Sequence, residues 1–134
     1  MVESAGLLII YDNKMILAHP SRKKSRMGTY TIPKGKLEKG ETHLEAAIRE
    51  TREEVGLNVD IDFIDQTPHI IDYTNERGLV YKRLTYYLVR LDEKLLLDEN
   101  LLQLIEVDWA GYLDKDESRM RIFWRFEEML DYLK

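Results

Sequence analysis

The chain has 134 residues, of which 44% are hydrophobic and 34% are charged, values typical of a globular domain large enough to bury one core. It contains no cysteine and has a formal net charge of −5, which excludes disulfides and thiolate metal sites and argues against a DNA-coating protein. No apolar run approaches the roughly 18 residues needed to cross a bilayer. The N-terminal residues 1–4 also lack the features of a signal peptide. We therefore expect one cytoplasmic domain over residues 1–134, without membrane or DNA partners.

Charge is unevenly distributed along the chain. Residues 1–40 contain eight Lys or Arg against three Asp or Glu, whereas residues 41–64 contain two against seven. If these two segments meet in the fold, they would form a site that grips an anionic ligand with one wall and holds metal cations with the other. The alternative is two solvated faces without a joint function.

The first half of the chain predicts a strand pair, a basic loop and a helix. Apolar runs at 6–11 and 15–18 flank turn residues. Residues 19–30 combine Pro, Gly, Ser and four cations, which is typical of an exposed loop, and residues 30–32 predict a short strand that stops at Pro33. From Thr42 to Val55, apolar residues recur at three- and four-residue spacing until Gly56, which predicts a helix with one buried face.

The second half predicts strands followed by a helix. Segments 59–64, 70–74 and 79–91 are rich in β-branched and aromatic residues, which favours antiparallel strands, and 107–110 predicts a last short strand. From 117 to 133 the apolar residues share one helical stripe. They are Ile122, Phe126, Met129, Leu130 and Leu133. Together these elements indicate an α+β protein.

The predicted helix at 42–55 carries three carboxylates on one side. At about 100° per residue, Glu50, Glu53 and Glu54 fall within an arc roughly 100° wide, beside the apolar arc. Like charges at these spacings destabilise an isolated helix by a few tenths of a kcal/mol per pair, so a compensating charge is expected. Mg²⁺ fits, because it takes oxygen ligands and is commonly shared between carboxylates and a substrate phosphate. Ion pairs with Arg49 and Arg52 are the alternative.

Residues before this helix complete a longer spaced pattern. It reads Gly35, five residues, Glu41, seven residues, and then Arg-Glu-Thr-Arg-Glu-Glu-Val-Gly-Leu from Arg49 to Leu57. The pattern resembles the Nudix box, the signature of the Nudix hydrolase family, and departs from it only at Thr51, where the family has an aliphatic residue. Thr51 lies on the packing arc, so the departure concerns local packing. The resemblance implies a single Nudix domain, an α/β/α sandwich whose mixed sheet packs between the catalytic helix and a C-terminal helix.

The resemblance also implies an enzyme that uses Mg²⁺ or Mn²⁺. Nudix hydrolases typically cleave a phosphoanhydride bond of a nucleoside diphosphate linked to another moiety. By position, Glu50, Glu53 and Glu54 correspond to the metal-binding carboxylates, and the carbonyl of Gly35 to an additional ligand. Bound metals polarise phosphate oxygens and lower the pKa of a bound water.

Other roles follow from the same correspondence. Arg49 would orient a carboxylate, with Glu53 as the first choice, and Glu41 would support the site from outside. Glu53 is also the first candidate for the group that accepts the proton from water. Glu106, just before the last predicted strand, is the second. Its competitors nearby are Asp98, Glu99 and Asp108.

Further residues are candidates for substrate binding. The cations near the box could bind a polyphosphate, and they are Arg22, Lys23, Lys24, Arg26, Lys34 and Lys36. Tyrosines could stack on a base, although strand packing is the alternative for each, and they are Tyr30, Tyr73, Tyr81, Tyr86 and Tyr87. The three histidines, His19, His43 and His69, lack metal-ligand spacing, so we expect surface or core roles for them.

The entry to the box suggests a substrate. Pro33-Lys34-Gly35 resembles the entry in Nudix hydrolases of diadenosine polyphosphates and diphosphoinositol polyphosphates, and Arg49-Glu50-Thr51 occurs in the diadenosine tetraphosphate branch. We therefore expect a small-molecule dinucleoside polyphosphate such as Ap4A. An ADP-ribose or nucleotide-sugar pyrophosphatase, an RNA 5′-end pyrophosphohydrolase and a diphosphoinositol polyphosphate phosphatase remain open, as do monomer and homodimer.

Two readings without catalysis compete with the enzyme. A nucleotide-binding sensor would be expected to have lost box acids, and here the box is intact. An acidic structural protein would leave the Gly and Glu spacing unexplained.

Overall fold

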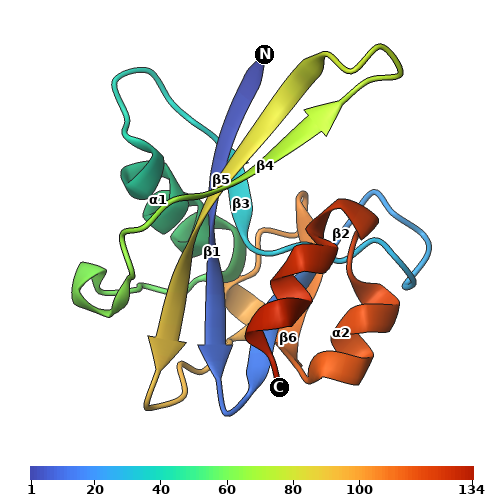
Figure 1. Ribbon diagram of the computed structural model, residues 1–134. Coiled ribbons are helices and arrows are strands. Elements are labelled where there is room, and N and C mark those ends of the chain that lie inside the picture. The colour runs from blue at the N-terminus through green and yellow to red at the C-terminus, as the bar shows by residue number, and fades with distance from the viewer.

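The computed structural model describes residues 1–134 and contains a six-stranded mixed sheet (Figure 1). Five strands run in the order β4-β5-β1-β2-β6, and β3 pairs with the start of β1. The pair β1–β5 is parallel and the other pairs are antiparallel. The strands are β1 (Val2–Tyr11), β2 (Lys14–Pro20), β3 (Lys34–Lys36), β4 (His69–Thr74), β5 (Val80–Leu91) and β6 (Val107–Leu113). The predicted mixed sheet is confirmed.

Helices cover both faces of the sheet. Helix α1 (His43–Val55) lies on one face, and α2 (Lys115–Arg121) and the 3₁₀ helix Trp124–Tyr132 lie on the other (Figure 1). Two shorter 3₁₀ helices span Ile61–Phe63 and Glu99–Leu101. No helix is both long enough and apolar enough to cross a membrane. The layers are those of the predicted α/β/α sandwich.

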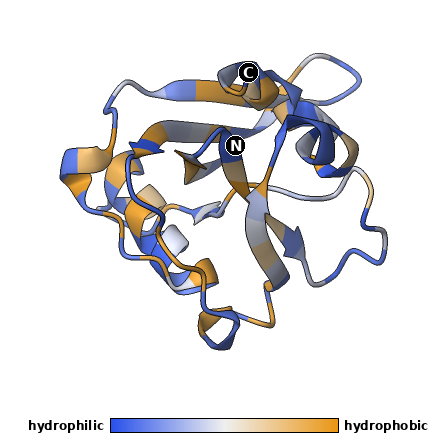
Figure 2. Cartoon of the chain, turned by 90° about the horizontal axis from the view of Figure 1, so that it is seen from below, coloured by the Kyte–Doolittle hydropathy of each residue, from blue (hydrophilic) through white to orange (hydrophobic).

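The sheet divides the core in two. Along β1, Leu7 and Ile9 face the α1 layer, whereas Leu8 and Ile10 face the C-terminal helices, as the two-residue period of a strand requires. Orange, hydrophobic segments lie on strands and helices, whereas several connecting loops are blue (Figure 2). With both faces covered, the central strands read as nearly continuous apolar runs.

Helix α1 begins and ends at sequence signals. Thr42 accepts from the Glu45 amide and Glu45 accepts from the Thr42 amide, a reciprocal capping box. Gly56 ends the helix at φ 73°, a left-handed conformation that glycine adopts without steric cost. The departure at Thr51 is satisfied locally, because its buried hydroxyl donates to the Ala47 carbonyl at 2.8 Å.

The strand predicted at 59–64 is wrong. This segment contains the 3₁₀ helix Ile61–Phe63, and Asp60 accepts from the Asp62 amide at its start. Only Ile64 makes a bridge, to Val89. The local hydrogen bond of the aspartate competes with strand pairing.

The single helix predicted at 117–133 is also wrong. The chain becomes extended at Ile122 and Phe123, between α2 and the 3₁₀ helix Trp124–Tyr132. Tyr30 causes the interruption, because its amide donates to the Arg121 carbonyl at 2.7 Å and its carbonyl accepts from the Phe123 amide at 2.9 Å. The five residues of the predicted stripe are nevertheless all buried.

Three more segments differ from the prediction. In place of the strand predicted at 30–32, Tyr30 and Thr31 form isolated bridges, and the regular strand β3 follows Pro33. Strand β2 extends to Pro20 and so contains His19, which the sequence placed in the loop. Strand β6 continues to Leu113, beyond the predicted 107–110.

Candidate active site

Arg49 connects the acids of the box. Its Nε and Nη2 donate to the two carboxylate oxygens of Glu41 at 2.6 and 2.9 Å, and Nη2 also donates to the Lys36 carbonyl at 3.0 Å. Nη1 donates to Glu50 and Glu53, both at 2.9 Å. These hydrogen bonds raise the pKa of Arg49, and the same contact holds the pKa of Glu41 below its ordinary value. The predicted orienting role of Arg49 has the required geometry.

Gly35 and Glu50 approach each other closely. Gly35 lies in β3, opposite Ala5 of β1, and a Cβ atom placed on it would overlap the Glu50 carboxylate. A larger residue at this position would displace the Glu50 carboxylate, so glycine lets the backbone and the acid lie side by side. A main-chain carbonyl beside a carboxylate is a donor set that suits a hard cation such as Mg²⁺.

Glu54 is a buried acid at the end of α1. It is 7% exposed, and its Oε1 accepts from the Lys34 amide at 3.3 Å. Burial raises the pKa of Glu54 to about 8, partly offset by Lys34. Burial also raises the pKa of Glu50. Two acids whose charged forms are disfavoured lie on one helix, which is the condition that a bound cation relieves.

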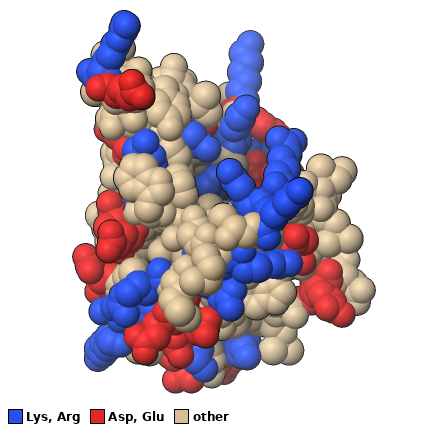
Figure 3. Space-filling model, turned by 90° about the vertical axis from the view of Figure 1, so that its right-hand side faces the viewer, with Lys and Arg blue, Asp and Glu red and all other residues tan.

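The acids open onto a cavity of about 510 Å³ that no hydrophobic residue lines. One part of its wall is cationic and another is anionic. Four of the lining side chains are Lys or Arg, and none of these forms an ion pair with a carboxylate. One face of the molecule shows Lys and Arg gathered around a hollow (Figure 3). The lining residues are Ser4, Arg22, Lys34, Gly35, Lys36, Glu50, Glu54, Lys82 and Glu106.

Backbone hydrogen bonds bring Glu106 to the box. The Gln103 amide donates to the Glu54 carbonyl at 2.9 Å, and the Glu106 amide donates to the Gln103 carbonyl at 2.8 Å. On its other side, the Ser21 amide donates to the Glu106 carbonyl at 2.9 Å. The Glu106 segment is therefore fixed between the end of α1 and the basic loop.

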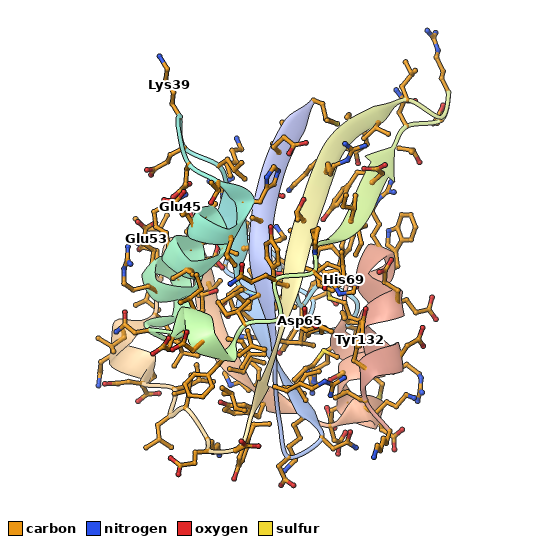
Figure 4. The ribbon with its side chains drawn as sticks, turned by 60° about the vertical axis from the view of Figure 1, so that its left-hand side comes forward. Lys39, Glu45, Glu53, Asp65, His69 and Tyr132 are labelled. Atoms are coloured by element: carbon orange, nitrogen blue, oxygen red, sulfur yellow. The ribbon has the colours of Figure 1, made fainter.

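Glu53 occupies a different position from its neighbours on α1. Its side chain is 50% exposed, does not line the cavity, and lies on the side of α1 away from the sheet (Figure 4). No three His, Asp or Glu groups are already close enough together to hold an ion. The assignments of Glu53 as a metal ligand and proton acceptor stay predictions.

The predicted basic cluster divides in space. Arg22, Lys34 and Lys36 line the cavity, whereas Arg26 donates to Asp108 at 3.2 Å. Lys24 is exposed. Tyr81 does not line the cavity, and its ring packs edge-on against Tyr73 with centroids 6.1 Å apart. Lys23 lies in the adjoining pocket described below.

Lys82 also lines the cavity, and it is not among the substrate-binding candidates that the sequence indicated. Burial, together with Lys34 and Lys36, lowers the pKa of Lys82 to about 8. The signal was its position, because Lys82 shares strand parity with the core residues Leu84 and Tyr86. A lysine on the inward side of a strand indicates an unusual environment.

A second pocket of about 340 Å³ adjoins the cavity and shares Lys34 and Lys82 with it. Its aromatic walls are Tyr73, Phe123 and Trp124, and its other lining residues are Pro20, Lys23, Gly28, Thr29 and Thr31. Trp124 is 66% exposed, whereas Tyr73 is buried. The sequence pointed to Tyr73 but not to Phe123 or Trp124, because their exposure depends on the break after Arg121.

Curated relatives resemble this chain over part of their length. An RNA pyrophosphohydrolase of Erythrobacter litoralis is 31% identical over 72 residues, which is 53% of this chain and 44% of that protein. A methanol dehydrogenase activator of Bacillus methanolicus is 30% identical over 131 residues, which is 97% of this chain and 61% of that protein. The chain thus spans about half of these relatives.

Solved structures share the fold over nearly the whole chain. A MutT NUDIX hydrolase from Burkholderia pseudomallei has a TM-score of 0.76 at 17% identity, covering 99% of this chain and 98% of the other. A C. elegans Ap4A hydrolase has a TM-score of 0.65 at 23% identity, covering 98% and 93%. The family model of the NUDIX domain matches residues 2–128. The predicted family is confirmed, and the chain belongs to the NUDIX family.

Proposed function

We propose that this chain is a Mg²⁺- or Mn²⁺-dependent hydrolase that cleaves a phosphoanhydride bond of a dinucleoside polyphosphate such as Ap4A. The observation that carries the proposal is the cavity of about 510 Å³, where Arg22, Lys34, Lys36 and Lys82 face carboxylates without pairing with them. Unpaired cations around a polar cavity suit an extended polyphosphate, because each additional phosphate can accept a further charge-assisted hydrogen bond.

The acids have separate tasks in this proposal. Glu50, Glu54 and the Gly35 carbonyl would hold the ions, Glu53 would join them once its side chain turns towards the cavity, and Arg49 orients Glu50 and Glu53. When bound, the ions polarise phosphate oxygens and lower the pKa of the attacking water.

We propose Glu106 as the group that accepts the proton from this water. It lines the cavity and pairs with no cation, whereas Glu53 is engaged by Arg49 and lies outside. The alternative, with Glu53 in this role, requires its side chain to turn towards the cavity.

The second pocket supplies a place for one nucleobase. Trp124 offers an exposed indole, and base stacking on an aromatic ring contributes about 1–3 kcal/mol. Lys34 and Lys82 line both the pocket and the cavity. A nucleotide whose base lies in the pocket can therefore extend its phosphates into the cavity. A similar structure is named an Ap4A hydrolase, which supports this choice.

The experiment compares Ap4A with ADP-ribose in Mg²⁺ or Mn²⁺ and identifies the products. The double variant Arg22→Gln/Lys23→Gln should lower kcat/KM for Ap4A by about 10- to 100-fold, corresponding to roughly 1.4–2.8 kcal/mol, and should affect ADP-ribose much less. Lys24→Gln/Lys39→Gln removes the same charge from exposed lysines outside the cavity and serves as the control. Equal losses on both substrates would contradict the polyphosphate assignment, and full turnover in excess chelator would contradict the metal dependence.

RNA 5′ ends are a second candidate, favoured by one observation. Curated relatives at 31% and 35% identity over part of this chain are named RNA pyrophosphohydrolases. Release of pyrophosphate or phosphate from 5′-triphosphorylated RNA, with a higher kcat/KM than for Ap4A, would place this activity first.

A further inference from the structure

His19 is a buried histidine with an oxygen partner on each ring nitrogen. It lies in β2 and is 1% exposed. Its Nδ1 is 2.7 Å from Oδ1 of Asp108, and its Nε2 is 2.9 Å from the Ser25 carbonyl oxygen. A carbonyl oxygen and a carboxylate oxygen are both hydrogen-bond acceptors, so each ring nitrogen faces a group to which an N–H can donate. The imidazole therefore connects Asp108 with Ser25, and we call this arrangement the bridge.

One end of this bridge holds the basic loop, residues 21–29. The Ser25 carbonyl accepts from His19 and also from the Thr29 hydroxyl at 2.8 Å. At the start of the loop, the Ser21 hydroxyl donates to the Leu104 carbonyl at 2.8 Å. Arg22 and Lys23, which line the cavity and the adjoining pocket, therefore lie between two anchored residues.

The other end holds the segment that carries Glu106. Asp108 follows Glu106 by two residues, and its Oδ1 also accepts from Nη1 of Arg26 at 3.2 Å. The His19 ring packs against Tyr30 with centroids 5.2 Å apart. The loop and the Glu106 segment are thus joined to each other through a residue of the sheet.

We propose that His19 is a positioning residue that fixes where the basic loop lies relative to Glu106, an inference that rests on the proposed function. Its Nε2 places Arg22 and Lys23 through Ser25, which governs substrate binding. Its Nδ1 places Glu106 through Asp108, which governs the hydrolytic step. His19 touches neither substrate nor the reacting atoms.

Two amide replacements separate these tasks. The Asn amide can replace Nδ1, so His19→Asn keeps the contact with Asp108 and loses that with Ser25. The Gln amide can replace Nε2, so His19→Gln keeps Ser25 and loses Asp108. We expect His19→Asn to raise KM for Ap4A about tenfold with kcat within about twofold. We expect His19→Gln to lower kcat about tenfold at nearly unchanged KM. Each change is of the size that the loss of one hydrogen bond produces. Equal changes in both variants would overturn the proposal in favour of simple packing.

A readout independent of activity separates this inference from the proposed function. Amide hydrogen exchange over residues 21–29 should be faster in His19→Asn than in wild type and His19→Gln, and unchanged in the control His69→Gln. Unchanged exchange in His19→Asn would overturn the positioning role even in an active enzyme. Failure of the wild type to cleave Ap4A, with the exchange pattern as expected, would overturn only the substrate. Asp108→Ala, on the exposed end of the bridge, removes the acceptor that faces Nδ1, so it should reproduce the kinetics of His19→Gln. This variant keeps the test decisive if a buried substitution does not fold.

Discussion

At the scale of single residues, Glu54 and Lys82 are two groups of the site whose charged forms are disfavoured by burial. Burial disfavours the carboxylate of Glu54 and the ammonium of Lys82, so the pKa values of both groups move to about 8 from opposite directions. Neither group is paired by a salt bridge. Groups shifted by desolvation inside a cleft are typical of functional sites.

Neutralising the box acids should remove activity without unfolding the protein. Glu53→Gln and Glu54→Gln should each lower kcat by about 10² or more, because each loses a metal ligand or proton acceptor. The free energy of unfolding of Glu54→Gln without metal should be at least that of wild type at pH 8, since a buried charge is removed and the amide oxygen still accepts from Lys34. Steady-state kinetics and urea unfolding test this, with the exposed Asp116→Asn as control. Near wild-type kcat in both variants would show that the roles are wrong.

Lys82 should give the stability a distinct pH dependence. Between about pH 8 and 10.5 the unfolded chain keeps a proton on Lys82 that the folded protein has lost, so the free energy of unfolding rises with pH in this window. In Lys82→Met this contribution disappears. The free energy of unfolding at pH 7 should increase by on the order of 1 kcal/mol, because the variant removes a desolvated ammonium that Lys34 and Lys36 repel. Water in the open cavity screens this repulsion and keeps the increase small.

Urea unfolding at pH 7 and pH 9.5 measures the effect of Lys82→Met. Lys39→Met, an exposed lysine outside the cavity (Figure 4), is the control and should keep the wild-type pH dependence. An unchanged pH dependence in Lys82→Met would refute the assignment of this shift to Lys82.

At the scale of elements, α1 is the part that the sequence describes best. Its start at the capping box, its end at Gly56 and its acidic face all follow from local signals. The C-terminal region was harder, because the hydrophobic stripe is the same whether one helix or two carry it. Tyr30, from a segment far away in the chain, decides the break.

Removing the cap of α1 should destabilise the fold but spare the chemistry. In Thr42→Ala the Glu45 amide loses its acceptor, so the free energy of unfolding should fall by about 1 kcal/mol. Thermal unfolding measures this loss, and kcat well below the transition should stay within about twofold of wild type. Thr42→Ser keeps the hydroxyl and should be close to wild type. No loss of stability in Thr42→Ala would contradict the capping role.

At the scale of the whole molecule, three distant segments form one site. The basic loop after β2, the end of α1 and the segment before β6 are joined by Ser21, Gln103 and Glu106. The opposite charges of residues 1–40 and 41–64 therefore meet in one cavity, the first of the two alternatives raised by the sequence.

Binding of a divalent cation should stabilise the whole molecule. Mn²⁺ at about 100 times its dissociation constant should raise the free energy of unfolding by about 2.7 kcal/mol, seen as a higher Tm that chelator reverses. Glu50→Gln/Glu54→Gln should lose most of this increase. An equal rise in Tm for wild type and the double variant would place the ion elsewhere.

The sequence by itself determined the family, the α+β class and the identity of the box acids, because spacing along one helix and the alternation along strands are local properties. Only the tertiary structure decided which acids face the cavity, that Glu106 and Arg22 join them, and that Lys82 and Trp124 belong to the same region. These depend on contacts between segments far apart in the chain. The helix at 117–133 failed for this reason too, since a bridge to Tyr30 outweighed its hydrophobic pattern. The strand at 59–64 failed for a local reason, because a hydrogen bond between Asp60 and the Asp62 amide competes with strand pairing.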